Sequence, residues 1–194
     1  MDDDREFSRR PPAAADSDTL ILVDATDRDV GALSKVRCHE GSGVLHRAFS
    51  LLIFNAAGDL LIQQRAATKR LWPLYWSNSC CSHPRTGESL DAATQRRLRE
   101  ELGLNCPLKF LFKFEYQAQF DATGSEHELC SVYAGRTDEA VRPDRQEILS
   151  WRWIAPKALT AAMSGSDAAK FTPWFKLEWR RVWRDHRAAL LALQ

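Results

Sequence analysis

The 194-residue chain has no apolar run that approaches the ~20 residues needed to cross a bilayer, so we expect no membrane partner. It also has almost no excess charge. Lys and Arg number 27 against 26 Asp and Glu, and the formal net charge of +1 gives no support to a nucleic-acid partner. The five cysteines are odd in number and irregularly spaced, which argues against a disulfide framework and for a reducing compartment.

Targeting signals are missing from both ends of the sequence. The start, Met-Asp-Asp-Asp-Arg, has no apolar core and is neither a secretory signal nor a typical transit peptide. The end, Ala-Leu-Gln, is no peroxisomal address. Residues 1–18 are polar, with two prolines and an alanine run, and we predict a disordered tail there. We therefore expect a cytoplasmic protein whose single domain covers residues 19–194.

The rest of the chain contains strand and helix patterns in a mixed order. Strands are predicted at 20–23, 48–54, 60–65 and 150–154, and the turn at 55–59 predicts a hairpin between the second and third of these. Residues 29–31 indicate a polar turn, and residues 34–46 a loop or a short helix followed by a loop. Helices are predicted at 89–102 with Gly103 as the stop signal, from Pro156, and at 171–193. This order predicts an α+β domain with a mixed sheet layered with helices.

The strongest strand signal is the strict alternation of residues 109–121. One predicted face carries Phe110, Phe112, Phe114, Tyr116, Ala118 and Phe120. The chain turns at 122–124 and returns as a partner strand at 126–136. A turn centred near Ala122 places Tyr116 almost opposite Glu128, within about 5 Å. The phenol is then either an ordinary core group or a hydrogen-bond donor that tunes the pKa of the carboxylate.

Imidazoles and carboxylates lie beside these strands in a pattern that suits a metal ion. Three histidines fall in loops next to predicted strands, and two glutamates share one strand face, which gives the set His39, His46, His83, Glu126 and Glu128. Such a set can bind a divalent ion such as Mn²⁺, Zn²⁺ or Mg²⁺. Each loop histidine taken alone is more simply explained as solvated. His127 points to the opposite strand face and is not expected to take part.

The polar loop at residues 76–84 carries a cysteine two residues before a histidine. Cys81 is a candidate acid, base or nucleophile, and the neighbouring His83 favours that interpretation. The alternative is a small buried residue, as free cysteines usually are. Cys80 is expected to point elsewhere, because adjacent residues diverge in an extended segment.

The helix that follows this loop carries Glu101 one turn after Arg97. The pair is either an i,i+4 salt bridge on a solvated face, worth only about 0.3–0.5 kcal/mol, or a metal ligand beside a phosphate-binding arginine. The basic candidates for binding a diphosphate are Lys35, Arg65, Lys69 and Arg97. Surface solubility explains any one of these four equally well.

This helix resembles a Nudix box, which has a glycine, five residues, a glutamate, seven residues and then Arg-Glu-apolar-x-Glu-Glu-x-Gly-apolar. Aligned on Gly103, the box begins at Ser82 and has Arg97 where the hydrolases carry a glutamate. The positions that are kept are Glu88, Arg96, Leu98, Glu100, Glu101 and Leu104. The opening glycine and one metal-binding glutamate are missing, which counts against pyrophosphate hydrolysis.

Four further motifs, in the same order, are similar to type I isopentenyl diphosphate isomerases. They are His-(six residues)-His-Arg-Ala-Phe-Ser at 39–50, Ser-Asn-x-x-Cys-Ser-His-Pro at 77–84, Glu-His-Glu-Leu-Cys at 126–130 and Phe-Thr-Pro-Trp at 171–174. The resemblance covers roughly residues 20–185 and is more specific than the box alone. It implies a Nudix-like fold of mixed β-sheets and helices. The implied activity, in isoprenoid biosynthesis, is a metal-assisted 1,3 proton shift that converts isopentenyl diphosphate to dimethylallyl diphosphate through a carbocation-like intermediate.

Carried over position by position, the resemblance also implies roles for single residues. Cys81 and Glu128 are the acid–base pair, and Tyr116 is the phenol on that glutamate. Trp174 covers the hydrocarbon end of the substrate, where its π face can stabilise a cation. One divalent ion, Mn²⁺, Mg²⁺ or Zn²⁺, is held by His39, His46, His83, Glu126 and Glu128. Glu101 helps to hold a Mg²⁺ that bridges to the diphosphate, and the diphosphate is contacted from Lys35, Arg65, Lys69 and Arg97.

Two other functions are compatible with parts of this pattern. A Nudix hydrolase of a nucleoside diphosphate derivative predicts the full glutamate set in the box, which Arg97 breaks. A catalytically dead metal-binding or scaffold domain predicts loss of Cys81 or of the metal ligands, and all of these are present. The expected partner is therefore a small molecule, isopentenyl diphosphate, and the expected assembly is a monomer or a weak homodimer.

Overall fold

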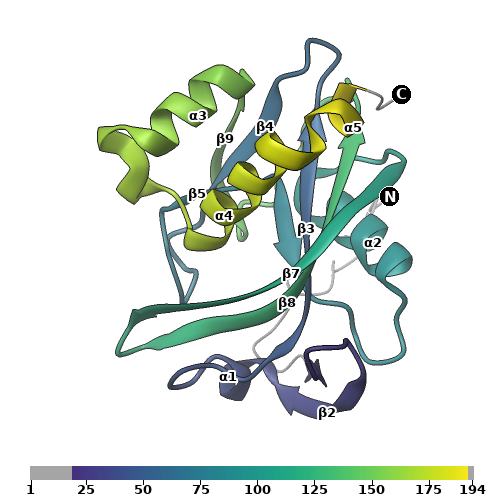
Figure 1. Ribbon diagram of the computed structural model, residues 1–194, viewed down its shortest axis with the longest axis vertical. Coiled ribbons are helices and arrows are strands. Elements are labelled where there is room, and N and C mark those ends of the chain that lie inside the picture. Colours follow the sequence, from purple (N-terminus) through teal and green to yellow (C-terminus); the bar gives the residue numbers. More distant parts are fainter. Residues whose placement is uncertain (1–18, 192–194) are drawn as a thin grey trace, which may run out of the picture.

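The protein is described by a computed structural model over residues 19–191, so the tail predicted at 1–18 lies outside the described residues. Nine strands join in one mixed sheet, and helices pack against both of its faces (Figure 1). The central strand is β3 (His46–Phe54). β8 (Gly124–Arg136) runs parallel to β3 along one whole edge. The predicted α+β class and mixed sheet are confirmed.

The other edge of β3 is shared by three short partners. β1 (Thr19–Val23) pairs at its start, β6 (Cys80–Ser82) at its middle and β4 (Leu60–Arg65) at its end. The hairpin expected between β3 and β4 is therefore correct only at its turn, where Phe54 pairs with Leu60. Beyond that point the prediction is wrong, because another side chain separates the two strands.

That side chain is the hydroxyl of Ser79. It accepts a 2.8 Å hydrogen bond from the backbone N–H of Ile53 on β3 and donates a 2.6 Å hydrogen bond to the carbonyl of Leu61 on β4. Buried backbone groups of the diverging strands are satisfied in this way without direct pairing. The space that opens between β3 and β4 admits β6, which carries Cys81 into the middle of the sheet.

One end of the sheet is formed by a strand with little apolar signal. β2 (Asp29–Ser34) pairs antiparallel with β1, so the polar turn expected at 29–31 is wrong. β2 is mostly exposed, with Val30 at 62% exposure, and an exposed strand lacks the buried alternation that predicts a strand. The helix α1 (Lys35–Cys38) follows β2. Of the two structures expected for residues 34–46, the short helix followed by a loop is therefore the correct one. At the other end, β4 pairs with β5 (Trp76–Ser77) and β9 (Ile148–Ile154).

A long hairpin of β7 (Leu108–Asp121) and β8 crosses the front of the molecule in Figure 1. Its register confirms that Tyr116 lies opposite Glu128. A bulge at Leu111 turns the start of β7 over, so that Phe110 packs edge-on against Tyr133 and is 50% exposed. The prediction that Phe110 shares the face of Tyr116 is therefore wrong.

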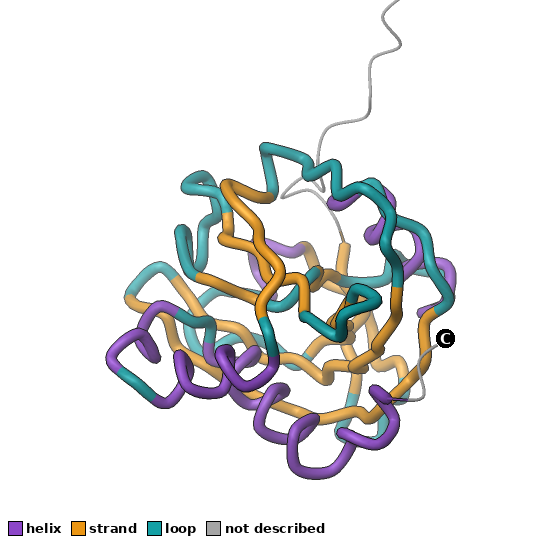
Figure 2. The backbone as a smooth tube through the Cα atoms, turned by 90° about the horizontal axis from the view of Figure 1, so that it is seen from above, coloured by secondary structure: helices purple, strands orange, loops and turns teal. Residues whose placement is uncertain are grey.

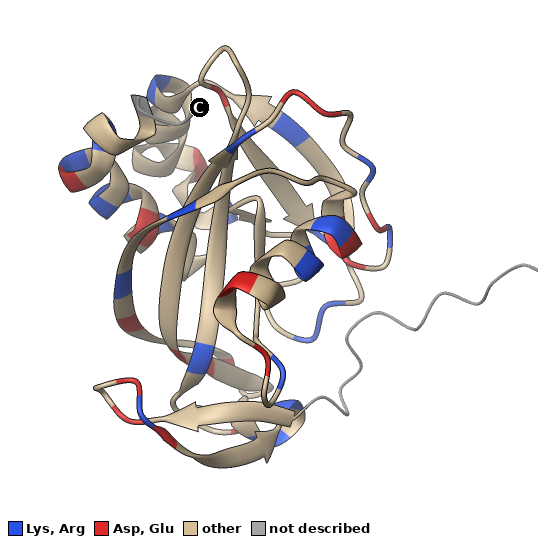
Figure 3. Cartoon of the chain, turned by 90° about the vertical axis from the view of Figure 1, so that its right-hand side faces the viewer, with Lys and Arg blue, Asp and Glu red and all other residues tan. Residues whose placement is uncertain are grey.

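The helix of the Nudix-like box is α2 (Leu90–Leu102). Ser89 caps its start by accepting a 3.2 Å hydrogen bond from the N–H of Ala92, and Gly103 ends it at φ 66°, a conformation that favours glycine. The predicted start and stop are confirmed. Figure 3 shows basic and acidic residues interspersed along α2 and the loops, as a net charge of +1 leads one to expect.

The opposite face of the sheet is covered by the C-terminal helices of the chain. Its elements are α3 (Pro156–Ser164), η1 (Ser166–Lys170), α4 (Pro173–Arg181), η2 (Val182–His186) and α5 (Arg187–Leu191). The helix expected from residue 171 begins at Pro173 instead, and η2 within it is a π-helical segment. Proline fits the first helical position and holds the preceding Thr172 extended at ψ 146°, which leaves Phe171 free to bridge to Trp76.

Successive side chains of β3 point to opposite faces of the sheet and pack into two separate hydrophobic cores. Ala48, Leu52 and Phe54 pack under α3 and α4, whereas Phe49 and Leu51 pack under α2. In the view from above, helices accordingly lie outside the strands (Figure 2). The even-numbered residues of β3 therefore face α4, and this places two polar ones on that side. Among the described residues, no helix is both long and apolar enough to cross a membrane.

Candidate active site

A cavity of about 230 Å³ opens on the α4 side of the sheet. Of the residues predicted for the site, those that line it are Lys35, His39, Arg65, Lys69, Cys81, His83, Arg97, Tyr116, Glu126, Glu128 and Trp174. The two others lie directly behind the lining and touch it. His46 has its Nε2 3.1 Å from Nε2 of His83, and Glu101 accepts a 3.0 Å hydrogen bond from Nε of Arg97. The residues predicted from separate motifs thus come together.

The sheet sets the distance between Cys81 and Glu128. β3 lies between the strands that carry them, with Ser50 opposite Cys81 and His46 opposite Glu128. Ser50 and His46 are four residues apart on one strand, so all four side chains face the same side. β6 and β8 are two strand spacings apart, about 9–10 Å across the sheet, and the four-residue offset along β3 adds about 13 Å along the strand direction. The thiol and the carboxylate therefore stand on two sides of one opening.

Three histidines and two glutamates form a compact cluster at one end of the cavity. One ligand atom from each of the five lies within 4.8 Å of all the others, and the set is His39, His46, His83, Glu126 and Glu128. Nδ1 of His39 lies 2.6 Å from the carbonyl of Lys35, and Nδ1 of His46 lies 2.7 Å from that of Val44. A carbonyl can only accept, so both Nδ1 atoms carry a proton and both Nε2 atoms face the cluster.

The carboxylates converge on the same point. Oε1 of Glu128 lies 3.0 Å from Nε2 of His83 and 3.8 Å from Nε2 of His46. Oε2 of Glu126 lies 2.7 Å from Nε2 of His39, but the two are not aligned as a hydrogen bond, and this buried oxygen has no other partner among the described residues. Converging lone pairs with an orphaned oxygen fit a divalent cation, for which a mixed nitrogen and oxygen set is suitable.

Burial controls the protonation of this cluster. It lowers the pKa of His46 to about 4 and, with His39 nearby, that of His83 well below the usual value. For His39 burial acts in the same direction, but Glu126 outweighs it and the pKa is raised. Neutral imidazoles are the form that binds metal, so a bound ion would require His39 to give up its proton. Burial and the adjacent Glu126 raise the pKa of Glu128 to about 7. For Glu126 burial acts in the same direction, but His39 outweighs it and the pKa is lowered.

Tyr116 completes the surroundings of Glu128. Its hydroxyl donates a 2.7 Å hydrogen bond to Oε2 of Glu128, as the hairpin register predicts. Burial and the charge of Glu128 raise the pKa of the phenol well above its usual value, so that it stays protonated and acts as a donor. One oxygen of Glu128 thus faces the phenol, and the other faces the histidines.

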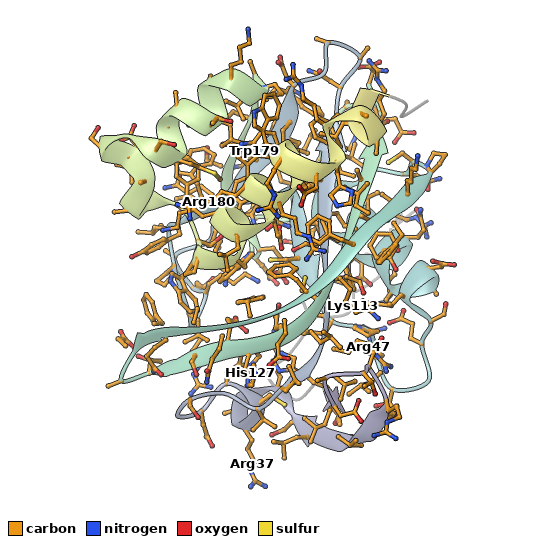
Figure 4. The ribbon with its side chains drawn as sticks, viewed as in Figure 1. Arg37, Arg47, Lys113, His127, Trp179 and Arg180 are labelled. Atoms are coloured by element: carbon orange, nitrogen blue, oxygen red, sulfur yellow. The ribbon has the colours of Figure 1, made fainter. Side chains whose placement is uncertain are left out.

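Cys81 faces the cavity, and its neighbour does not. Cys80 is fully buried among Phe49 and Leu51 beneath α2, as the divergence of adjacent residues predicts. Burial raises the pKa of Cys81 to about 12, although Arg65 acts against it. The side chain is therefore a thiol, with its proton in place, in the free protein. His127 lies on the outer face of the hairpin with its Nε2 2.9 Å from Glu115, away from the cluster (Figure 4).

Four cations line the same cavity as the histidine and glutamate cluster, namely Lys35, Arg65, Lys69 and Arg97. Arg65 donates to the carbonyls of Leu71 (2.9 Å) and Trp72 (3.0 Å), and its guanidinium carbon lies 5.4 Å from the centre of the Trp174 ring. These bonds hold Trp72 at φ 46°, which is unusual for a large side chain. Burial and the nearby Lys69 lower the pKa of Lys35. A polyanion in this cavity would meet positive charge on several sides.

Arg97 and Glu101 are both buried. The exposed fraction of the surface is 4% for Arg97 and 3% for Glu101. The interpretation as a salt bridge on a solvated face is therefore wrong. Glu101 is not part of the His and Glu cluster, and its contact is with Arg97. Arg97 also donates a 3.1 Å hydrogen bond to Glu147, and Lys69 makes an ion pair with the same carboxylate.

Two buried carboxyl groups were missed by the sequence analysis. Glu147 joins Lys69 to Arg97 on the cavity wall, but a single glutamate before a strand gave no signal. Glu178 on α4 is fully buried and accepts a 2.6 Å hydrogen bond from the hydroxyl of Ser50. Its spacing of three after Phe175 and four before Val182 places it on the apolar stripe of the helix, and this periodicity could have revealed it.

Known proteins were compared with this chain. The NUDIX domain profile matches residues 44–175. An isopentenyl-diphosphate Delta-isomerase of Burkholderia multivorans is 46% identical over 156 residues, which cover 80% of this chain and 88% of the relative. Isopentenyl-diphosphate Delta-isomerase 1 of Photorhabdus laumondii is 41% identical over 171 residues, 87% of this chain and 97% of the relative. The chain belongs to the isopentenyl-diphosphate Delta-isomerase family of Nudix proteins.

Solved structures agree on the fold of this isomerase family member. The DR0079 protein of Deinococcus radiodurans has a TM-score of 0.71 at 24% identity and covers 86% of this chain and 100% of its own. A MutT protein of Methanosarcina mazei has a TM-score of 0.61 at 16% identity, with 74% and 96% covered. These likenesses confirm the Nudix fold. For function the isomerase relatives weigh more, because hydrolase-like structures match at much lower identity.

Proposed function

We propose that this isomerase family member converts isopentenyl diphosphate to dimethylallyl diphosphate. The observation that carries the proposal is the placement of Cys81 and Glu128 on two sides of one opening, on strands that flank β3. The reaction needs one proton added and another removed at different carbons of a flat five-carbon unit. Two proton-transfer groups that approach from different sides suit this geometry.

The reaction adds one proton to the substrate and removes one from it. One group gives a proton to the terminal alkene carbon, which forms a C–H bond and leaves a tertiary carbocation. The other removes a proton from the methylene next to the tertiary cationic carbon, on the diphosphate side, and the electrons of that C–H bond form the new double bond. Glu128, with its pKa near 7, and the Cys81 thiol are the groups placed for these transfers. No oxidant, reductant or leaving group is required.

The aromatic wall suits the cationic intermediate. Trp174 is 3% exposed and packs edge-on to Trp72 with ring centres 5.2 Å apart. Its π face can stabilise a desolvated cation by about 2 kcal/mol. That amounts to about 30-fold in rate, so positioning and proton transfer supply most of the acceleration. The same rings exclude water, which would trap the cation as an alcohol.

Metal ions complete the proposal. The three histidines with Glu126 and Glu128 would hold one divalent ion, Mn²⁺, Mg²⁺ or Zn²⁺, whose charge would favour the ionised form of Glu128. Glu101 and the cations Lys35, Arg65, Lys69 and Arg97 would hold the diphosphate together with a bridging Mg²⁺. Support for this part comes from the family and from the shared cavity wall.

The proposal also covers the compartment, the partners and the assembly of the enzyme. All five cysteines are free, which fits the reducing conditions of a cytoplasm. A small-molecule substrate needs no nucleic-acid or membrane partner, and a monomer or weak homodimer remains our prediction. Hydrolysis of a nucleoside diphosphate derivative is the less supported alternative, because Arg97 replaces a metal-binding glutamate of the hydrolase box. Arg97 also makes ion pairs with two buried carboxylates, Glu101 and Glu147.

The test is incubation of the full chain with isopentenyl diphosphate and Mg²⁺, with and without Mn²⁺. We expect the acid-labile allylic isomer to form, and Cys81→Ala to make almost none. Phosphate release from a panel of nucleotides, with no allylic isomer, would move the protein to the hydrolases. Full activity in Cys81→Ala would contradict the acid–base assignment alone.

A further inference from the structure

Asn78 belongs to the cysteine motif but has no role in the reaction described above. It is fully buried and does not line the cavity. Its Oδ1 accepts a 3.2 Å hydrogen bond from Nε1 of Trp174, and the indole N–H can only donate, so the orientation of the amide is fixed. Its Nδ2 then donates a 2.6 Å hydrogen bond to the carbonyl of Cys80. One amide therefore joins the indole to the strand that carries Cys81.

Ser50 and Glu178 support this amide from behind. The hydroxyl of Ser50 accepts from Nδ2 of Asn78 at 3.3 Å and donates to Oε1 of Glu178 at 2.6 Å. Ser50 also lies opposite Cys81 in the pairing of β3 with β6. The hydrogen bonds thus form a closed ring that leaves α4 at Glu178, passes through β3 and the loop, and returns to α4 at Trp174.

Glu178 is an acceptor without a counter-charge. It is fully buried, makes no salt bridge with any described residue, and its second oxygen has no partner there. A buried carboxyl group in such a place is held in its neutral form. Burial, more than the charge of Glu128, raises its pKa to about 8. A neutral acid at the end of the ring can accept from Ser50 without drawing a cation into the core.

We propose that Asn78 is a positioning residue of the isomerase reaction, anchored by Ser50 and Glu178. It holds the indole of Trp174 and the strand of Cys81 in fixed relation across the cavity. This inference rests on the proposed function. The diphosphate is bound by cations on other elements, so loss of the ring misplaces the reacting groups and leaves substrate binding intact. The expected signature is a fall in kcat with KM unchanged.

Steady-state kinetics of full-length variants with isopentenyl diphosphate test the proposal. Asn78→Ala is expected to lower kcat about 100-fold with KM within about 3-fold, because small displacements of reacting groups cost this much. Ser50→Ala and Glu178→Leu are expected to lower kcat about 10-fold by releasing the amide. Glu178→Gln keeps the Oε1 acceptor and is expected to restore kcat to within about 2-fold of the original chain.

Thr160→Ala is the matched control. The hydroxyl of Thr160 also accepts a hydrogen bond from an indole N–H, that of Trp179 at 2.9 Å, and donates to the carbonyl of Pro156 at 2.9 Å, but Thr160 does not line the cavity. We expect a lower Tm with kcat retained. The proposal would be overturned if Asn78→Ala and Ser50→Ala behaved like the control, with a lower Tm and an unchanged kcat. If Asn78→Ala does not fold, Ser50→Ala and the two Glu178 variants decide the matter.

A readout without catalysis separates this proposal from the proposed function. In the NMR spectrum of ¹⁵N-labelled protein, the indole N–H signal of Trp174, assigned with Trp174→Phe, is expected to shift in Asn78→Ala and Ser50→Ala but not in Thr160→Ala. An unmoved signal contradicts the ring. A moved signal in a chain that makes no allylic isomer supports the ring and rejects the isomerase function.

Discussion

Tyr116 donates a 2.7 Å hydrogen bond to Oε2 of Glu128 across the β7–β8 hairpin. The bond lowers the pKa of Glu128, against the effects of burial and of Glu126, which raise it. The other oxygen of Glu128 faces the histidine cluster. A single carboxyl group therefore connects the hairpin, the metal ligands and the proposed proton transfer.

Tyr116→Phe removes this hydrogen bond and keeps the ring. The pKa of Glu128 should then rise, because a donor to its ionised form is lost. We expect kcat/KM to fall about 10- to 100-fold, and the Glu128 pKa in the pH–rate profile to move upward. Unchanged pH dependence would show that the phenol only packs. Phe114→Leu changes a neighbouring aromatic residue without touching Glu128 and serves as the control.

Loss of one imidazole should remove the ion from the histidine and glutamate cluster. His46 is fully buried with its Nε2 directed at His83, so His46→Ala is expected to weaken binding of Mn²⁺ or Zn²⁺ at least about 100-fold. His127→Ala, on the outer face of the hairpin, should bind as the original chain does. Calorimetric titration of chelator-treated protein gives both affinities, and equal affinities would refute the assignment.

Metal removal should also lower the stability of the fold. An ion present at 100 times its Kd stabilises the folded chain by about 2.7 kcal/mol. We therefore expect Tm to fall on treatment with a chelator and to recover on addition of Mn²⁺. In His46→Ala neither change should be seen. A recovery of Tm in that variant would place the stabilising ion elsewhere.

The carboxyl group of Glu178 should make stability fall as pH rises. Its pKa in the folded chain is about 8, above its ordinary value, so the folded state binds more protons than the unfolded one between these two pH values. The stabilisation is fully present below about pH 4.5 and is lost as pH rises through about 8, at up to about 1.4 kcal/mol per pH unit. Glu178→Gln lacks this dependence.

Urea unfolding at pH 5 and pH 9 measures this effect. The variant Glu178→Gln is expected to gain free energy of unfolding relative to the original chain at pH 9, and to gain little at pH 5. A difference between the two chains that does not vary with pH would mean that Glu178 ionises normally. That result would require water or a cation beside its second oxygen.

Glu147 is expected to hold two cations of the diphosphate wall in place. Glu147→Gln removes the charge that pairs with both Lys69 and Arg97, and we expect KM for the diphosphate substrate to rise about 10-fold, with a loss of about 2 kcal/mol in the free energy of unfolding. Glu100→Gln is the matched control, because Glu100 also pairs with Arg97 but has a side chain that is 42% exposed. It should cost less than about 0.5 kcal/mol. Equal effects would contradict a special role for Glu147.

Local rules predicted the parts of the molecule that depend on neighbours in sequence. The helix pattern at 89–102 and the stop at Gly103 predicted α2, and counting back from the turn at 122–124 set Tyr116 opposite Glu128. The clustering of the predicted metal ligands was foreseen in part because strand alternation places Glu126 and Glu128 on one face. Roles carried over from the family remain predictions until the residues are tested.

Non-local contacts set the parts that the sequence did not predict. A hydroxyl from Ser79 separates β3 from β4, and no pattern in either strand reveals it. One extra residue at Leu111 reverses the face of Phe110. Glu147 owes its role to cations that lie 50 and 78 residues away in sequence. Propensity and periodicity carry no information on such pairings.

The parallel pairing of β3 with β8 also determines when the site can exist. His46 and Glu128 are partners in this pairing, and the whole of β4 to β7 lies between them in the chain. Long-range parallel contacts of this kind form slowly, since a large loop must close first. During synthesis the histidines leave the ribosome long before Glu128, and they cannot form the complete ion site until the hairpin has followed. If the cluster binds its ion as we propose, ion binding can follow only after the β7–β8 hairpin has folded onto β3.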